Sequence, residues 1–579
     1  MRAFGLLLCL AWLMLAGACG ASEWCVLDSG AVADGVTDNT PAFQKALDEA
    51  GKAGGGTVNV PAGQYRIDGN LVVPSNVTLQ GTYRVPPFAQ RGNVEAAKGS
   101  VLLAYAGRGS EEGEPFIRLK GSACAIAGLI VMYPEWSKSD VPPVPYPPCV
   151  GSEDSKNVGI LDCLLLNPYE AISLVRAHRF IVRNVQGYPI KRGIYVDQCY
   201  DVARIENVHF WPFRTPYDPE NPYCKWINTQ GVAFEFARVD WPYVLNTFCF
   251  GYGVGYKFSE SEHGSSNGNF VGIGADSCRR PVLVEQCSTA GLLILNGEFV
   301  GRWASEDAVG VEIGEQCKGK VSMNNCIFFG PIDRDVWLRG PSAQFTAIGC
   351  NFGGWDNTGL GSPAIQLDAG KAIVQGSTFG DGALHVRIGE NVSSAILIGN
   401  QANDGLVIDN RAGERTQMVA NELSPVVWTD AAKAHYRITI GSKGDVRYVR
   451  KWQQREDPIR WSRPPSMLVL PVLPGKQYTI SIDLDVPQAA RADNAGLYLG
   501  EDRIAQLPDA DSGTIRAVLP PSDSDTVTLR LKCKAWIPKQ IIEGSEDTRW
   551  LGLQVRSVTM QAKGAKWKLF DANTGEWAK

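Results

Sequence analysis

The sequence predicts an all-β chain in which a parallel β-helix with an N-terminal capping helix is followed by a C-terminal β-sandwich. Three observations support this prediction. An amphipathic helix near residue 40 leads directly into short strands. The middle of the chain repeats units of two or three short strands, and after Met467 the pattern changes to longer strands that alternate with turns. Stacked short strands that start from a helical cap are typical of a solenoid.

The predicted capping helix covers residues 40–53. Thr40 and Pro41 provide an N-cap residue and a proline at the first helical position. Apolar residues follow at helical spacing, and the run of three glycines at 54–56 ends the helix. The short strands TVNV, QYRI and NLVV come next, each ended by Pro, Gly or Asn.

This N-terminal string, residues 28–81, resembles the corresponding segment of the pectate-lyase-like superfamily. That group includes the rhamnogalacturonase, epimerase and tailspike-like right-handed parallel β-helices. The resemblance implies a right-handed β-helix and a carbohydrate-active function. It implies no catalytic residue, because the segment is a cap. The Asn-Thr-Asp, double-Asp, Gly-His-Gly and Arg-Ile-Lys motifs of polygalacturonase-like hydrolases are absent from the sequence.

Periodic units fill the middle of the chain, from about Asn70 to Gly413. Two similar stretches start at Asn157 and Arg179, and a second series runs through the later coils. In that series one place is taken in turn by Cys326, Cys350, Ser377 and Asn400. A phenylalanine falls two residues after this place, at Phe299, Phe328, Phe352 and Phe379. Each coil buries its apolar side only against its neighbours, so these rings are expected to stack. The leucine spacing of a leucine-rich repeat is missing.

The predicted domains are therefore a β-helix over 22–413, a linker or closing strands over 414–465, and a β-sandwich of jelly-roll type over 466–579. Secreted sandwiches beside carbohydrate-active β-helices are often sugar-binding modules. A stabilising or capping role for this C-terminal domain is an equal alternative.

Residues 1–21 have the features of a secretory signal. Arg2 precedes a short apolar core and a run of small residues. Export to the medium or the periplasm is expected, with lipid anchoring through Cys19 as the alternative. Export permits disulfides, and pairings among Cys149, Cys199, Cys224 and Cys249 stay open, whereas Cys163 is expected to be a buried hydrophobe. The sequence gives no oligomeric state.

The charge and the loops point to a polysaccharide partner. The formal net charge is −5 without a long basic run, which argues against nucleic-acid binding. Long loops rich in aromatic residues and proline interrupt the coils and should form a groove. The candidate substrate-binding residues in and beside these loops are Trp211, Arg214, Trp241, Tyr243, Lys191 and Arg192. Aromatic faces suit the C–H surfaces of sugars.

Two kinds of chemistry are compatible with this groove. Glycoside hydrolysis needs two carboxyl groups that flank the bond. Elimination from a uronic acid needs a base and a group, or Ca²⁺, that neutralises the substrate carboxylate. The candidate catalytic residues are Asp197, Asp240 and Asp276, with His263 as a base. An Asp at a strand end is more often a turn former, and a single His is more often packed or solvated. No metal site is predicted, except Ca²⁺ in the case of a lyase.

The sequence thus predicts a secreted enzyme that cleaves a polysaccharide as a glycoside hydrolase or a polysaccharide lyase. A noncatalytic glycan-binding or surface-adhesion protein on the same solenoid is the first alternative. An epimerase or a tailspike-like depolymerase is the second.

Overall fold

The computed structural model describes residues 23–84, 98–212, 217–302, 307–456, 458–566 and 568–578. The predicted signal segment and Arg214 lie outside these residues. The chain divides into two units, Met1–Phe299 with Gln316–Ser322 and Val300–Glu315 with Met323–Lys579. They are described in turn below as the first unit and the second unit.

The first unit is a stack of coils whose strands pair in parallel in three columns. The first column holds β1 (Glu23–Cys25), β3 (Gly56–Asn59), β6 (Val77–Gln80), β9 (Ala125–Ala127), β18 (Tyr243–Leu245), β23 (Gly268–Val271) and β26 (Leu292–Leu295). The second column holds β2 (Asp34–Asp38), β4 (Gly63–Ile67), β7 (Ser100–Ala104), β10 (Leu129–Met132), β19 (Phe248–Phe250), β24 (Gly274–Cys278) and β27 (Glu298–Gly301). Three long strands run from the first column into the second: β12 (Gly159–Leu166), β14 (Ile181–Gly187) and β16 (Arg204–Phe210).

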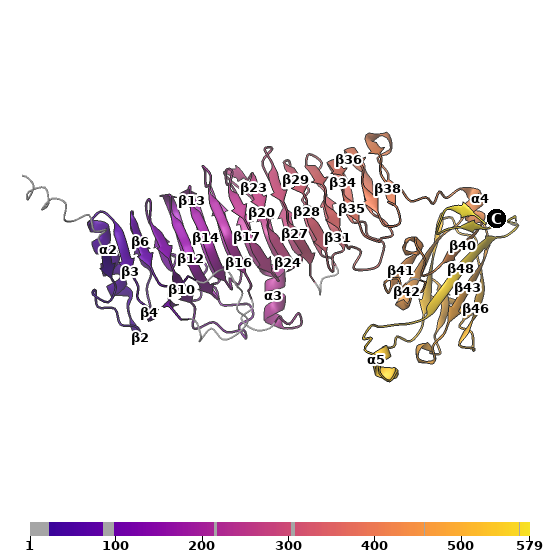
Figure 1. Ribbon diagram of the computed structural model, residues 1–579, viewed down its shortest axis with the longest axis horizontal. Coiled ribbons are helices and arrows are strands. Elements are labelled where there is room, and N and C mark those ends of the chain that lie inside the picture. The colour runs from indigo at the N-terminus through magenta and orange to yellow at the C-terminus, as the bar shows by residue number, and fades with distance from the viewer. Residues whose placement is uncertain are drawn as a thin grey trace, which may run out of the picture. The chain divides into compact units, whose positions relative to one another are not determined.

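The third column holds β5 (Leu71–Val73), β8 (Ile117–Leu119), β11 (Val150–Lys156), β13 (Glu170–His178), β15 (Arg192–Asp197), β17 (Val232–Phe236), β20 (Val254–Phe258) and β25 (Arg280–Val284). A small antiparallel pair, β21 (Glu260–Ser261) and β22 (Gly264–Ser265), follows β20. The helix α3 (Pro222–Gln230) lies in the connection from β16 to β17 and projects from the coils (Figure 1).

The helix α2 (Thr40–Lys52) lies at the end of this stack, beside β3 and β6 (Figure 1). It buries Phe43, Ala46, Leu47 and Ala50 completely, so the predicted capping helix is confirmed. Its N-cap residue is Asn39, one residue before the expected Thr40. The Thr40 hydroxyl accepts hydrogen bonds from the backbone N–H groups of Asp68 and Gly69, at 3.1 and 3.0 Å. Thr40 thus fixes the next coil rather than the helix end.

Asparagine residues form a ladder at the corner between the first and second columns. Asn184, Asn207 and Asn246 all have φ between 51° and 57°, a left-handed conformation that asparagine tolerates better than most residues. The Asn207 amide donates to Asn184 Oδ1 at 3.1 Å, and the Asn184 amide donates to Asp162 Oδ1 at 2.8 Å. The recurrent Asn in the sequence repeat therefore sets the bend of each coil.

In the second unit, β28 (Val309–Ile313), β31 (Arg334–Leu338), β34 (Ile365–Gln375), β36 (Val386–Ile398) and β38 (Ile408–Asn410) form one parallel column. A second column holds β30 (Ile327–Phe329), β33 (Asn351–Phe352), β35 (Thr378–Phe379) and β37 (Gln401–Ala402). The strands β32 (Gln344–Ile348) and β39 (Thr416–Val419) pair with the later halves of β34 and β36. The strand β29 (Lys320–Asn324) crosses the division between the units.

The predicted phenylalanine ladder is confirmed within these coils. The ring of Phe352 is stacked on Phe328 with centroids 5.2 Å apart and on Phe379 at 4.7 Å. The place two residues earlier forms a hydrogen-bond ladder. The Ser377 hydroxyl accepts from the Cys350 backbone N–H at 3.2 Å, and Asn400 Oδ1 accepts from the Ser377 N–H at 3.0 Å. Repeated inward positions therefore do place like side chains above one another.

The C-terminal part of the second unit has two sheets around one apolar core. The six-stranded sheet holds β40 (His435–Thr439), β43 (Tyr478–Asp485), β46 (Ser512–Leu519), β48 (Gln554–Ala562), β49 (Phe570–Asp571) and β50 (Glu576–Trp577). The five-stranded sheet holds β41 (Val449–Trp452), β42 (Ser462–Pro471), β44 (Gly496–Leu499), β45 (Asp502–Gln506) and β47 (Thr526–Lys532). The helical segments are α4 (Asp430–Ala434), α5 (Pro538–Ile541), η2 (Gly413–Arg415), η3 (Asp445–Arg447) and η4 (Gln488–Ala490).

The segment predicted as a linker or closing strands, 414–465, is shared between these structures. β39 pairs with β36 and extends the coils to Val419. β40 pairs with β48 and buries Tyr436 and Ile438 in the core of the two sheets. The C-terminal sheets therefore begin at His435, because the charged residues of this segment alternate with buried apolar ones.

Within the described residues every cysteine is a free thiol, including Cys149, Cys199, Cys224 and Cys249. No helix in the described ranges is both long enough and apolar enough to cross a membrane.

Candidate functional site

The outer face of the second column carries the strongest candidate site of the first unit. The alternation of a strand sends Phe210, Cys249 and Ala275 inward, where each is fully buried. Their successors Trp211, Phe250 and Asp276 therefore point outward from three successive coils. Phe250 and Asp276 are direct partners in the parallel register of β19 and β24. The structure thus brings together two of the residues predicted from sequence, Trp211 and Asp276.

Aromatic rings form the surface beside Asp276. The indole of Trp211 is stacked on the Phe250 ring, with centroids 4.0 Å apart and an interplanar angle of 11°. Tyr217 meets the same Phe250 ring edge-on at 5.5 Å. Trp211 and Phe250 are only half-buried. A partly exposed aromatic stack of this kind suits the apolar face of a sugar ring.

Two carboxyl groups lie at the polar end of this surface. Burial raises the pKa of Asp276, and the negative charge of Glu298 raises it further. Glu298 begins β27 and is exposed, and its backbone N–H donates to the Ile273 carbonyl at 3.0 Å. We call Asp276 and Glu298 the carboxyl pair. Two carboxyl groups with different environments are the usual arrangement for an acid and a base in one site.

His209 adds a neutral imidazole to the same face. Burial lowers the pKa of His209, so its uncharged form is favoured at neutral pH. The ring lies edge-on to Phe248 at 5.1 Å, in the coil that precedes Asp276. Its Nε2 is buried and has no hydrogen-bond partner among the described residues. A neutral histidine can act as a general base through a ring nitrogen that faces the substrate.

The other predicted catalytic residues lie together elsewhere, where the third column leads into the first. Asp197 accepts hydrogen bonds from the Arg238 backbone N–H at 3.0 Å and from the Ser261 hydroxyl at 2.8 Å. His263 lies between β21 and β22, and its backbone N–H donates to the same Ser261 hydroxyl at 3.2 Å. Asp240 accepts from the Asn267 amide at 3.2 Å. The single groove expected for all four catalytic candidates is therefore replaced by two separate places.

The remaining predicted binding residues follow the same division. Trp241 and Tyr243 are each 39% exposed and lie next to Asp240 in sequence, away from the Trp211 stack. Lys191 forms an ion pair with Glu111 and lies over the Tyr169 ring. Arg192 is held between Glu170 at 2.8 Å and Glu235 at 3.2 Å. Both cations already have protein partners, as expected for residues with a structural role.

The site residues predicted from the sequence did not include Phe250, Glu298 or His209. The repeat itself contained the missing signal. Glu298 directly precedes Phe299, a ladder residue, and therefore had to point outward from its coil. Among the described residues no three His, Cys, Asp or Glu side chains converge in the manner of metal ligands.

Comparison with known proteins finds a family match for the N-terminal part of the chain. Residues 25–117 match the family described as rhamnogalacturonase A/epimerase, pectate lyase-like. This match confirms the resemblance of residues 28–81 to the pectate-lyase-like superfamily.

Two curated relatives, both from Azotobacter vinelandii, are polysaccharide-modifying enzymes. Alginate lyase 7 is 50% identical over 66 residues, which are 10% of this chain and 8% of the relative. Mannuronan C5-epimerase AlgE4 is 33% identical over 117 residues, 19% of this chain and 21% of the relative. The chain therefore matches only a small part of the length of either relative.

The solved structures that match are distant in sequence. The tailspike protein of E. coli bacteriophage HK620, in complex with a pentasaccharide, is 12% identical with a TM-score of 0.42, over 88% of this chain and 93% of that one. The AlgE4 A-module is 15% identical with a TM-score of 0.31, over 68% of this chain and 97% of that one.

Proposed function

We propose that this chain, whose N-terminal segment belongs to the pectate-lyase-like superfamily, is an enzyme that cleaves an acidic polysaccharide on the outer face of the second column. The observation that carries the proposal is the carboxyl pair beside the Trp211–Phe250 stack. The partial matches to an alginate lyase and to mannuronan epimerases support the substrate class, because alginate and mannuronan carry a carboxylate on each sugar.

The leading reaction is hydrolysis of a glycosidic bond. Asp276, with its raised pKa, keeps a proton to higher pH than an ordinary carboxyl group and donates it to the leaving oxygen. Glu298, exposed at the start of β27, acts as the base that activates water or as the nucleophile. The stacked indole and phenyl rings hold a neighbouring sugar unit against the coils. Sugar units then extend along the stack, because successive coils repeat at about 4.8 Å.

A second reaction is favoured by His209 and by the names of the relatives. A neutral His209 takes the proton at C5 of a uronate, and protonated Asp276 hydrogen-bonds to the substrate carboxylate. In elimination the C4–O4 bond breaks, the C4–C5 double bond forms, and the leaving oxygen takes the proton that the His209 imidazolium now holds. In epimerisation C5 instead takes a proton from water on the other face.

The experiment is a turnover assay of the purified chain on polymannuronate, polygalacturonate and neutral polysaccharides. Reducing ends report hydrolysis, absorbance of the unsaturated sugar reports elimination, and proton NMR reports epimerisation. The variants are Asp276→Asn, Glu298→Gln and His209→Gln. Asp240→Asn is the matched control, because Asp240 lies with Asp197 away from the carboxyl pair. Circular dichroism checks that each variant folds.

Loss of a general acid or base is expected to lower kcat by about 10²–10⁴-fold. If Glu298→Gln is inactive and His209→Gln is active, the reaction is hydrolysis. The reverse result assigns proton abstraction to His209. Full turnover in Asp276→Asn contradicts both mechanisms. Binding of the polymer without any turnover in the unmodified chain supports the noncatalytic glycan-binding alternative instead.

A further inference from the structure

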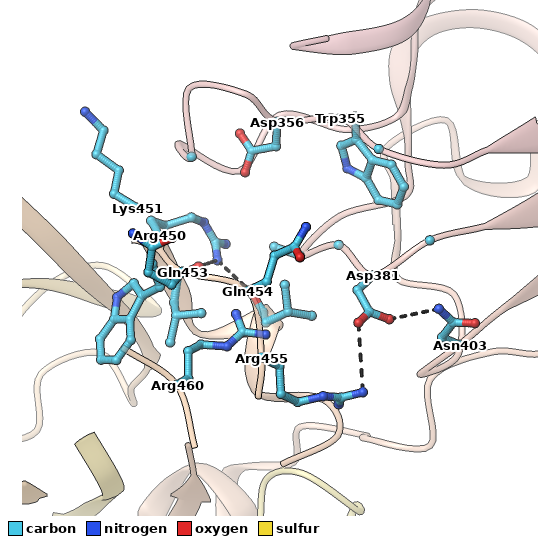
Figure 2. Close-up of a pocket in the computed structure, with 18 of the residues that line it drawn as sticks. Trp355, Asp356, Asp381, Asn403, Arg450, Lys451, Gln453, Gln454, Arg455 and Arg460 are labelled. Carbon is cyan, nitrogen blue, oxygen red and sulfur yellow. Dashed lines mark hydrogen bonds and ion pairs between the residues drawn. The ribbon is translucent and has the colours of Figure 1, made fainter. Parts of the chain in front are cut away.

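The second unit contains a cavity of about 540 Å³, within the usual range of about 300–1,000 Å³ for small-ligand sites. Its wall comes from the loops after β33 and β35 on one side and from the segment 446–460 on the other. Figure 2 shows Trp355, Asp381 and Asn403 on the first side, with Arg455 and Arg460 facing them. This cavity shares no residue with the proposed catalytic face.

The cavity wall is predominantly cationic. Four basic side chains line it, namely Arg450, Lys451, Arg455 and Arg460, against two carboxylates, Asp356 and Asp381. The carboxylate of Asp356 is already occupied by its own loop. It accepts from the backbone N–H groups of Leu360, Gly361 and Ser362 at 2.9–3.0 Å. Arg450 likewise donates to the carbonyls of Val446, Arg447 and Val449. The positive charge that a ligand meets therefore comes from Lys451, Arg455 and Arg460.

Arg455 is the cation best placed for a ligand. Its Nη1 donates a long hydrogen bond to Asp404 at 3.5 Å, and its Nη2 lies 3.9 Å from Asp381, which is a long contact for an ion pair. Asp381 also accepts a shorter hydrogen bond from the Asn403 amide, at 3.1 Å, and Figure 2 marks both contacts. The guanidinium thus keeps donors for a carboxylate that enters the cavity.

Arg460 provides an independent sign of a ligand-binding site. The residue is only 6% exposed, and its Nη2 lies 3.1 Å from Asp445 Oδ1. Its Nε, however, is buried without a hydrogen-bond partner among the described residues. Buried donors are nearly always paired, so an unpaired guanidinium N–H at a cavity wall points to an acceptor that belongs to a ligand.

Trp355 gives the cavity a surface for a sugar ring. The indole Nε1 donates to the Leu384 carbonyl at 3.0 Å, which fixes the plane of the ring. A Cβ at Gly382 would lie 1.9 Å from that ring, so the glycine is required for its position. The Gln454 amide adds a hydroxyl partner beside it, whereas the amides of Asn403 and Gln453 donate to Asp381 and to the Trp550 carbonyl. A fixed indole with amides and guanidinium groups matches an acidic sugar better than a simple inorganic anion.

We propose that this cavity is a noncatalytic binding site for an anionic saccharide, with the sugar carboxylate on Arg455 and Arg460 and the sugar ring against Trp355. The site goes beyond the proposed function, because it would hold a polymer or its product at a second place on the chain.

The test is calorimetric binding of hexamannuronate to the full chain. The measurements use a background with Asp276→Asn and Glu298→Gln, so that turnover cannot remove the ligand. Neutral cellohexaose and inorganic phosphate are the comparison probes. The site variants are Arg455→Gln, Lys451→Gln and Gly382→Ala. Lys476→Gln is the matched control, because Lys476 is exposed and outside the cavity wall.

Hexamannuronate is expected to bind and to lose at least tenfold in affinity in Arg455→Gln and Gly382→Ala, with no change in Lys476→Gln. Equal affinity for cellohexaose and hexamannuronate overturns the proposal. The proposal also fails if phosphate binds in a manner that depends on Arg455 and hexamannuronate does not bind. If Arg455→Gln does not fold, Lys451→Gln replaces it as the test of the cationic wall, because it changes an exposed side chain. Unchanged affinity in every folded site variant also overturns the proposal. Because binding is measured without turnover, failure of the catalytic assignment leaves this result intact.

Discussion

Acidification should weaken the second unit through His385. This residue directly precedes β36 and is 2% exposed. Its Nδ1 accepts from the Val407 backbone N–H at 3.0 Å, and its Nε2 lies 3.3 Å from the Gly380 carbonyl. The first contact needs an unprotonated Nδ1 and the second a protonated Nε2. Both ring nitrogens are therefore used by the neutral form, which joins two successive coils.

Burial lowers the pKa of His385 from 6.5 to about 4. The hydrogen bond to Gly380 acts in the opposite direction, the charge of Arg447 lowers the pKa further, and Asp381 and Asp404 raise it. The unfolded chain binds a proton near pH 6.5, whereas the folded chain does so only near pH 4. The stabilisation is therefore complete above pH 6.5 and is lost as the pH falls toward 4. At 1.36 kcal/mol per pKa unit, the loss is about 3 kcal/mol.

The assay is urea unfolding of the unmodified chain and of His385→Gln between pH 7.5 and pH 4. The variant lacks the titrating group, so the difference in unfolding free energy between the two proteins isolates His385. That difference should shrink by about 2 kcal/mol by pH 5 and about 3 kcal/mol by pH 4. Imidazole NMR should show a ring that stays neutral down to about pH 5. Parallel pH curves for the two proteins, or a ring that titrates near 6.5, would refute the reasoning.

Three further outcomes are expected. Phe352→Ala should lower the free energy of unfolding by about 3–5 kcal/mol in urea titrations, because it empties the middle of the phenylalanine ladder, whereas removal of the exposed Phe329 ring should cost within about 0.5 kcal/mol. Burial raises the pKa of Asp335 well above its usual value, so the folded chain favours the protonated form and becomes less stable as the pH rises. Asp335→Asn should therefore raise Tm more at pH 8 than at pH 5 in thermal scans. An equal shift of Tm at both pH values would contradict this. Turnover that depends on protonated Asp276 should fall as the pH rises through the raised pKa of this group. If Glu298 causes this fall instead, the fall should be absent from the pH profile of Glu298→Gln.

The coils could be predicted because inward positions repeat from one coil to the next. Cys350, Ser377 and Asn400 stand at one such position, and the structure joins them by hydrogen bonds. Phe352 and Phe379 are stacked for the same reason. A strand in a solenoid contacts mainly the strands above and below it. The residue one repeat away in the sequence is therefore the residue against which each inward side chain packs.

The capping helix was also predictable, because its apolar residues have a local period. Its predicted start at residue 40 is confirmed, but the N-cap is Asn39. Thr40 looks like an N-cap, yet its hydroxyl is used by the backbone of Asp68 and Gly69. The segment after Gly413 was harder to assign. Its strand β40 alternates buried and exposed residues over only five positions, and its partner β48 lies more than a hundred residues later in the sequence.

The sequence by itself determined the stacked coils, the cap and the class of residues on the loops. Only the tertiary structure decided which candidate residues share a face. Asp197 and Asp276 both lie on strands of the coils, but β15 belongs to the third column and β24 to the second. Alternation along a strand tells inward from outward, yet each column faces its own direction. That direction is set by the bends between columns, and those bends depend on contacts between coils rather than on local sequence.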